Sequence, residues 1–190
     1  YFVHTPGLKV VMASTPYDAK GLLISAIRDP DPVIFFEPKR IYRAIKEEVP
    51  EKEYSIPIGK AKIIKEGKDV TLITYGAMTK ISREAVEKVT DVDIELIDLR
   101  TLSPLDEETI INSVKKTGRV VIVHEAPKTL GFGAEIIARI TEKAVYSLQA
   151  PIERVTGYDI IVPLAKNEHH YLIKHERIIE AVKRAMVNGI

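Results

Sequence analysis

The sequence contains no cysteine. Disulfides, thiolate metal sites and cysteine nucleophiles are therefore excluded together, and the absence is compatible with a reducing compartment. No apolar run approaches the roughly 20 residues that cross a bilayer, and residues 1–6 lack the basic and apolar regions of a signal peptide. We therefore expect a cytoplasmic protein. Because the sequence does not begin with methionine, we expect that residues precede Tyr1 in the natural protein.

An excess of charge of one sign is also missing, since 28 lysines and arginines face 27 aspartates and glutamates. No net field directs such a chain towards nucleic acid or an anionic membrane, and we expect neither as a partner. The hydrophobic content of 45% is enough for a proper core. The chain should therefore be globular.

The first 36 residues have the pattern of a strand, a helix and a second strand. Residues 8–12 are a short apolar run, and Thr15 and Pro16 suit the N-cap and the first position of a helix. Apolar residues then recur at helical spacing until residues 29–32, Asp-Pro-Asp-Pro, stop the helix. Residues 33–36 follow as a buried strand. The unit has the length that a right-handed parallel crossover requires.

Residues 37–57 are rich in charges and prolines, and we interpret them as a linker without a packed element. After them, apolar runs at residues 70–74, 94–97, 120–123 and 152–155 alternate with amphipathic helices, and a terminal helix contains Ile178, Ile179, Val182 and Met186. Regular alternation of this kind predicts an α/β fold with a mostly parallel sheet and helices on its faces.

Gly131-Phe132-Gly133 lies between a strand and a helix, where free helix amides can hold a phosphate. The dinucleotide fingerprint fails because Ile136 stands where its third glycine belongs, and no acidic residue closes a strand about 20 residues later. We therefore interpret the glycines as a tight turn that lets helix and strand approach.

Two groups of histidines are candidates for chemistry. His124 and Glu125 end a parallel strand, at the edge where open α/β sheets bind ligands, but adjacent strand residues point to opposite faces. We expect His124 in an interface or a turn. Glu168, His169, His170 and His175 lack zincin spacing, and a solvated loop is the better interpretation.

Residues 29–32 combine two carboxylates and several carbonyls at a helix C-terminus, whose partial negative charge attracts cations. A hard, oxygen-ligated cation is one interpretation and a simple Asp-Pro turn the other. Arg119, Arg139 and Arg154 stand singly, as is typical of solvated faces or ion pairs. The sequence has no serine nucleophile elbow, Walker loop, paired catalytic carboxylates or kinase signature.

Several blocks of the sequence extend over nearly the whole chain. They are residues 1–11 (YFVHTPGLKVV), 17–23 (YDAKGLL), 32–39 (PVIFFEPK), 56–61 (IPIGKA), 97–101 (IDLRT), 116–119 (KTGR), 124–127 (HEAP), 133–136 (GAEI) and 154–159 (RVTGYD). Taken together, these blocks resemble the β subunit of branched-chain 2-oxo acid and pyruvate dehydrogenases. So many blocks in the same order are very improbable as a coincidence.

The resemblance implies a heterotetramer of two α and two β subunits with thiamin diphosphate and magnesium between them. A second β subunit and the lipoyl acyltransferase core are further partners that it implies. The family's pyrimidine-activating glutamate and His-Ser-Gln histidine precede the block that opens this chain, and His4 does not match that histidine. We therefore assign no catalytic and no cofactor-binding residue here, and expect this segment to serve assembly and docking.

The resemblance also implies domains and two further sites. Residues 1–50 correspond to the end of the pyrimidine-binding domain, 51–56 to a linker and 57–190 to a transketolase C-terminal-like domain. A structural potassium ion in relatives corresponds to Ala26, Asp29 and Asp31 here. The acyltransferase docks near the chain end, here Ile190, although Gln149 stands where some relatives carry an acid.

Two other functions are compatible with these residues: the C-terminal half of a transketolase-like enzyme, and a non-catalytic docking domain. A glutamate and a His-Ser-Gln stretch upstream on the same natural chain would separate them from the dehydrogenase. The choice between pyruvate and branched-chain 2-oxo acids cannot be read, because the pocket is built largely elsewhere.

Overall fold

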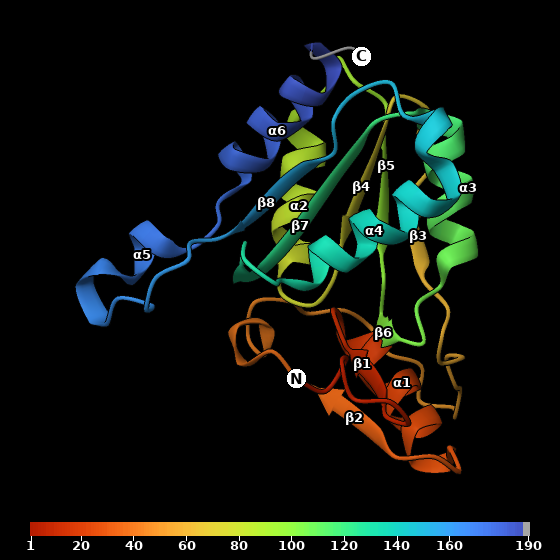
Figure 1. Cartoon of the computed structure of the whole chain (residues 1–190). Helices are drawn as coiled ribbons and strands as arrows, with labels where there is room; N and C mark the ends of the chain where they lie inside the picture. The colour runs from red at the N-terminus through yellow and green to blue at the C-terminus, as the bar shows by residue number, and fades with distance from the viewer. Residues whose placement is uncertain (188–190) are drawn as a thin grey trace.

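Residues 1–187 are described by a computed structural model, in which a three-stranded sheet lies beside a five-stranded one (Figure 1). The smaller sheet begins with β1 (Lys9–Met12), which α1 (Pro16–Arg28) connects to the parallel strand β2 (Val33–Phe36). Thr15 caps α1 by accepting a hydrogen bond from the Asp18 amide, 3.1 Å away, and Pro16 occupies the first turn. The predicted strand, helix and strand are confirmed, but β2 is half-buried and not buried as predicted, because it lies at the edge of its sheet.

The larger sheet has the strand order β3-β5-β4-β7-β8. Four of its strands are parallel, and only the edge strand β3 runs antiparallel. This confirms the predicted mostly parallel α/β sheet. The strands are β3 (Lys62–Lys65), β4 (Val70–Thr74), β5 (Ile94–Asp98), β7 (Val120–Pro127) and β8 (Glu153–Gly157).

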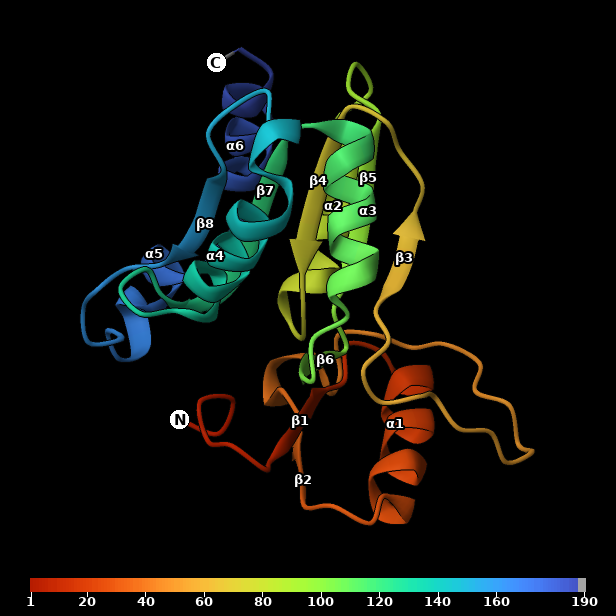
Figure 2. The same ribbon diagram turned by 45° about the vertical axis from the view of Figure 1, so that its right-hand side comes forward.

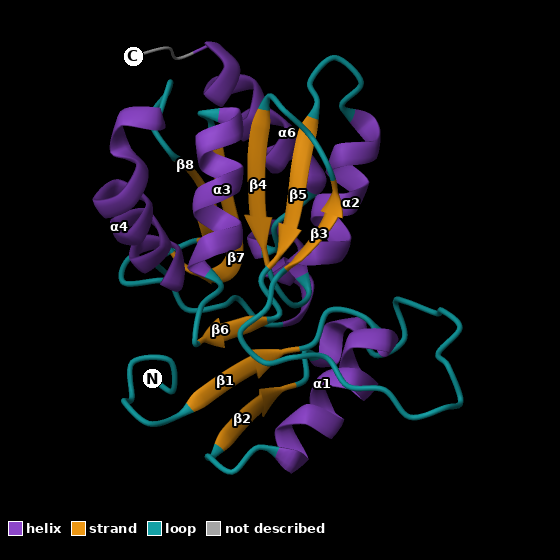
Figure 3. Cartoon of the chain, turned by 90° about the vertical axis from the view of Figure 1, so that its right-hand side faces the viewer, coloured by secondary structure: helices purple, strands orange, loops and turns teal. Residues whose placement is uncertain are grey.

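Helices cover both faces of this sheet (Figure 3). One face packs against α2 (Met78–Lys88) and α6 (His175–Val187), and the other against α3 (Glu107–Thr117) and α4 (Phe132–Ala144). The central strands β4 and β5 are buried at every position because both faces are covered. None of the helices described over residues 1–187 is both long and apolar enough to span a membrane.

Two short strands were not predicted from the sequence. The edge strand β3 alternates half-buried and exposed residues, so its apolar pattern is weak. β6 (Thr101–Ser103) pairs antiparallel with β1, and the three-stranded sheet therefore has the order β2-β1-β6. We call β1, α1 and β2 the N-terminal unit, and the five-stranded sheet with its helices the C-terminal unit. β6, which follows β5 in the chain, thus joins the two units.

The interpretation of residues 37–57 as an unpacked linker is wrong in one respect. Apart from the short helix η1 (Lys39–Ile41) the segment is irregular, but it packs along α1. The Tyr54 ring stacks on Tyr17 with centroids 4.5 Å apart, and the buried Ile56 donates its amide to the Gly21 carbonyl at 3.1 Å. The sequence pattern could not predict this packing, because Tyr17 and Tyr54 are 37 residues apart and belong to no common periodic pattern.

The C-terminal part contains two more short turns and a projection. After α4 comes η2 (Val145–Ser147), and η3 (Ala165–Asn167) leads into α5 (Glu168–Tyr171). Residues 158–171 extend away from the sheet, with α5 at the far left of Figure 1 and again on the left of Figure 2. Ile160, Ile161 and Leu164 are exposed on this projection.

Candidate functional site

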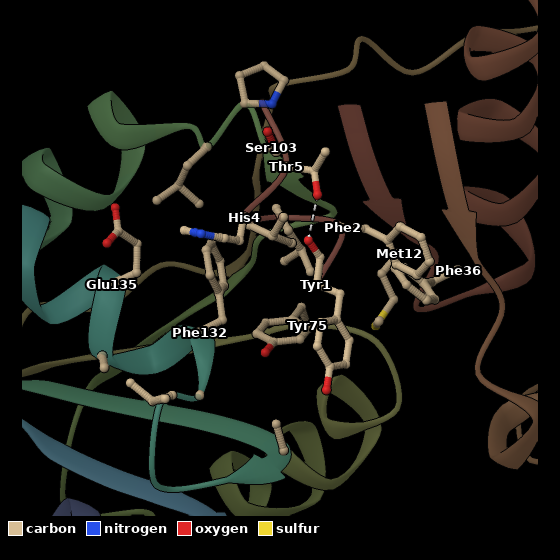
Figure 4. A pocket seen from close by; sticks show the side chains of 18 of the residues that line it. Tyr1, Phe2, His4, Thr5, Met12, Phe36, Tyr75, Ser103, Phe132 and Glu135 are labelled. Atoms are coloured by element: carbon tan, nitrogen blue, oxygen red, sulfur yellow. Dashed lines mark hydrogen bonds between the residues drawn. The ribbon is translucent and has the colours of Figure 1, made fainter. Parts of the chain in front are cut away.

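A cavity of about 1590 Å³ lies between the N-terminal residues, β6 and the first turn of α4. Aromatic side chains from both units line it, among them Phe2, Phe36, Tyr75 and Phe132 (Figure 4). Tyr75 follows β4, and its ring packs edge-on against Phe132 at 6.2 Å between centroids. The cavity thus adjoins the carboxyl ends of parallel strands, where α/β sheets bind ligands.

The acidic side chains at this cavity are engaged in ion pairs. Glu125 contacts Arg40 at 3.0 Å, which ties β7 to η1. Glu107 contacts Arg139 and Lys143, and these two cations hold the pKa of Glu107 below its ordinary value, against a smaller effect of burial. No acid of this set therefore stands ready as a free general base.

His124 does not act together with Glu125. Its ring is fully buried, lies 6.3 Å from the Tyr75 ring, and places Nδ1 3.2 Å from the Ala126 carbonyl oxygen. Burial lowers the pKa of His124, which keeps the imidazole neutral at physiological pH. The exposed Glu125 points away, so the prediction of opposite faces is confirmed. His124 does not lie in a turn: it belongs to β7, and its ring packs where this strand meets the start of α4.

The histidine explains the glycines of residues 131–133. A Cβ atom on Gly133 would lie 2.7 Å from His124 Nε2, and one on Gly131 would lie 2.4 Å from the Pro127 carbonyl oxygen and 2.6 Å from His124 Cε1. Both glycines are required because the strand and its imidazole approach the helix so closely. The tight-turn interpretation is confirmed.

At the end of α1, the structure brings together two of the residues predicted to hold a cation and adds a third. Lys9 Nζ lies 2.7 Å from Asp29 Oδ1 and 2.9 Å from Asp31 Oδ2. Its hydrogen bond, aided by one from the Asp31 amide, lowers the pKa of Asp29, and the two carboxylates raise the pKa of Lys9. Ala26 lies in the last turn of α1, whose carbonyls have no intrahelical partner. No sequence pattern indicates that Lys9, 20 residues before Asp29, belongs to this group.

The C-terminal histidines form no metal cluster. His169 and His170 belong to the short helix α5, so the loop interpretation is wrong in detail, and their rings lie 3.9 Å apart. His175 begins α6 and contacts Lys88 at 2.5 Å. Within residues 1–187 no three His, Cys, Asp or Glu side chains are placed to hold a metal.

The remaining predicted residues have ordinary contacts or lie outside the described part. Arg139 pairs with Glu107 and Glu135, as expected of an ion-pair residue, and Arg154 donates to the Lys128 carbonyl at 3.1 Å. Gln149 donates its amide to Gly118 at 2.7 Å. Ile190 lies outside the described residues.

Two family models match the chain, and together they cover most of it. "Transketolase, C-terminal domain" matches residues 59–178, and "Transketolase, pyrimidine binding domain" matches residues 1–45. A solved structure described as "Split gene transketolase, inactive beta4 tetramer" superposes with a TM-score of 0.80. It covers 100% of this chain and 60% of that one at 22% identity, which shows the fold.

Curated relatives are much more similar in sequence. The pyruvate dehydrogenase E1 component subunit beta of Acholeplasma laidlawii is 54% identical over 185 residues, which cover 96% of this chain and 57% of that one. The mitochondrial 2-oxoisovalerate dehydrogenase subunit beta of Dictyostelium discoideum is 56% identical over 190 residues, with 98% and 51% covered. The chain spans about half the length of these relatives. It therefore belongs to the transketolase C-terminal domain family, among the pyruvate and 2-oxoisovalerate dehydrogenase β subunits, of which it corresponds to the C-terminal part.

Proposed function

We propose that this chain contributes the C-terminal part of a β subunit to an enzyme that decarboxylates a 2-oxo acid and passes the acyl group to a lipoyl arm. The observation that carries this proposal is the identity of 54% and 56% to two such β subunits over nearly all of the chain. The role of this segment is assembly. Its two units are joined by the pairing of β1 with β6, so they present one continuous surface to the rest of the enzyme.

The whole enzyme would use thiamin diphosphate and magnesium, the cofactor supplying the carbanion chemistry. The described residues do not fit such a site by themselves. Glu107 and Glu125 at the cavity are neutralised by Arg139, Lys143 and Arg40, and the described chain offers no group of three metal-ligating side chains. We therefore place the cofactors against other parts of the enzyme.

Potassium is a second part of the proposal. Asp29 and Asp31 lie at a helix end with unpaired carbonyls, among them that of Ala26, and oxygen ligands of this kind suit a hard cation. The Lys9 ammonium already contacts both carboxylates. Potassium and Lys9 would therefore compete for the same oxygens, and the ion would bind best where Lys9 swings away.

The proposed partners are the α subunit, a second β subunit and the lipoyl acyltransferase core, in a cytoplasmic complex. The proposal rests on the family, and on exposed apolar side chains at Ile160, Ile161 and Leu164 that an assembly would cover. Cell fractionation followed by pull-down of the tagged chain would test both the location and the set of partners.

Reconstitution tests the main proposal. This chain and its cognate α subunit together should give no 2-oxo acid decarboxylation and no tight thiamin diphosphate binding. Supplying the N-terminal half of a related β subunit as a separate polypeptide should restore both, with pyruvate and 2-oxoisovalerate as parallel substrates. Decarboxylation without that half, or ketol transfer in place of decarboxylation with it, would overturn the proposal.

A further inference from the structure

A cluster of buried polar side chains lies where the two units meet. Asp98 and Thr74 are the last residues of β5 and β4 and are register partners, so their side chains share one face of the sheet. The β residues that alternate with them pack against α2 on that face. The other members come from α2 and from the N-terminal unit, and all are at most 1% exposed: Ser14, Asp18, Thr79 and Ser82.

Hydrogen bonds through this cluster connect the units. Arg100 reaches across to Asp18 in the first turn of α1, with NH2 2.5 Å from Oδ1. Thr79 of α2 donates to the Ser14 hydroxyl at 3.1 Å, and the Met12 amide of β1 donates to the Arg100 carbonyl at 2.8 Å. The junction therefore depends on where the Arg100 backbone and guanidinium are held.

Asp98 holds that backbone. Arg100 has a φ of 55°, in the left-handed region that costs a residue with a side chain about 1 kcal/mol or more. Its amide donates to Asp98 Oδ1 at 3.1 Å, and β6 begins at the next residue. Asp98 thus fixes the turn from which Arg100 crosses to α1 and from which β6 pairs with β1.

The charges of the cluster do not balance when Asp98 is ionised. Two carboxylates, Asp98 and Asp18, then face one guanidinium, that of Arg100, while Ser14, Thr74 and the two α2 residues contribute hydroxyls. Lys62, the register partner of Asp98 on β3, places its ammonium over the Tyr17 ring, 5.8 Å from the centroid. Within residues 1–187, Asp98 Oδ2 and Thr74 Oγ1 have no hydrogen-bond partner. Burial, with a smaller contribution from Asp18, raises the pKa of Asp98 to about 6, against the opposing hydrogen bonds of Ser14 and the Arg100 amide.

We propose that Asp98 is a proton-controlled latch between the two units, closed when the carboxyl is neutral and loosened when it ionises. The neutral acid leaves the Asp18–Arg100 pair balanced and brings an O–H donor beside Thr74. Ionisation puts an uncompensated negative charge in a buried site. Ionisation loosens β1, β6 and the turn between β5 and β6. Met12 on β1 and Ser103 on β6 line the cavity. The latch therefore governs how wide the cavity opens.

Hydrogen exchange of the purified chain tests the latch. After correction for intrinsic exchange rates, opening of the amides at residues 10–13 and 100–103 should increase about tenfold from pH 5 to pH 8. This factor follows from a carboxyl that titrates near 6 when closed and near 3.9 when open. Asp98→Asn, which mimics the neutral acid, should give a low opening that no longer changes with pH. Asp91→Asn, at an exposed carboxyl, should keep the wild-type profile.

Two results would overturn the proposal. One is a wild-type opening that is flat between pH 5 and pH 8, and the other is an Asp98→Asn profile that matches the wild type. If Asp98→Asn does not fold, the carboxyl carbon of Asp98 is titrated by NMR in the wild-type chain. A midpoint near 4 would contradict the latch, and a midpoint near 6 that shifts together with the amides of residues 100–103 would support it.

Discussion

Replacing Gly133 by alanine should destabilise the protein, although alanine is normally the better helix residue. Gly133 is in the first turn of α4, where alanine is favoured by up to about 1 kcal/mol. The added Cβ would lie 2.7 Å from His124 Nε2 and 2.9 Å from its Cδ2. The ring cannot easily move, because it is fully buried and fixed by Tyr75 and the Ala126 carbonyl.

Overpacking of this kind costs typically about 1–3 kcal/mol, so the net loss should be about 1–2 kcal/mol. At this chain length that corresponds to a fall in melting temperature of roughly 2–8 °C. Urea denaturation followed by circular dichroism measures the change. Ala134→Gly, at an exposed position in the same turn, calibrates helix propensity without a clash.

A double-mutant cycle identifies the cause. In a His124→Ala background, the clash is gone and Gly133→Ala should be neutral or stabilising, which gives a coupling energy of about 2 kcal/mol. A Gly133→Ala variant more stable than the wild type would refute the reasoning. It would mean that the ring moves freely and that the glycines serve another purpose, such as an anion site at the helix N-terminus.

The other predictions concern charges and assembly. Potassium should raise the melting temperature of Lys9→Met more than that of the wild type. The corresponding gain in the free energy of unfolding is up to about 2.7 kcal/mol at a hundredfold excess over Kd. Tetramethylammonium should leave both melting temperatures unchanged. Asp29→Asn should remove the potassium response and Glu142→Gln, at an exposed acid, should preserve it; equal curves in both salts would refute the site. Burial opposes ionisation of Glu95, but its hydrogen bonds with Lys116 and Ser113 outweigh this effect and lower its pKa. Lys116→Met should therefore lower the free energy of unfolding by about 1–3 kcal/mol at pH 7. A carboxyl whose pKa is lowered in the folded protein stabilises that protein at pH values above the ordinary 4.5, and this stabilisation is lost as the pH falls through the folded-state pKa. The urea midpoints of the wild type and of Lys116→Met should therefore converge in acid. A difference between them that stays constant with pH would contradict this. The isolated chain should self-associate at micromolar concentration. Sedimentation as a monomer, with no increase in mass when the α subunit is added, would count against this prediction.

Local signals in the sequence were sufficient for most of the elements. Thr15 and Pro16 define the start of α1 by capping and by fixed backbone geometry, which depend only on neighbouring residues. The apolar runs of β4, β5 and β7 predicted buried parallel strands, because a strand covered on both faces is mostly apolar and does not alternate with polar residues. The opposite orientations of His124 and Glu125 followed from the period of a strand.

Contacts between distant residues needed the tertiary structure. β6 has only three residues, and nothing within it indicates that it would pair with β1 some 90 residues earlier. Likewise Lys9 meets Asp29 and Asp31 only because β1 and β2 lie in parallel register, with Lys9 opposite Val33.

The candidate site divides in the same way. The sequence by itself determined the family blocks, the glycines beside a strand and the acidic helix end, since each is a pattern of neighbouring residues. Only the tertiary structure decided that the glycines accommodate His124, that the acids pair with Lys9, and that Asp98, Asp18 and Arg100 form one buried cluster. The physical reason is that burial and charge pairing depend on which surfaces meet, and a sheet brings together residues that the sequence separates by more than 80 positions.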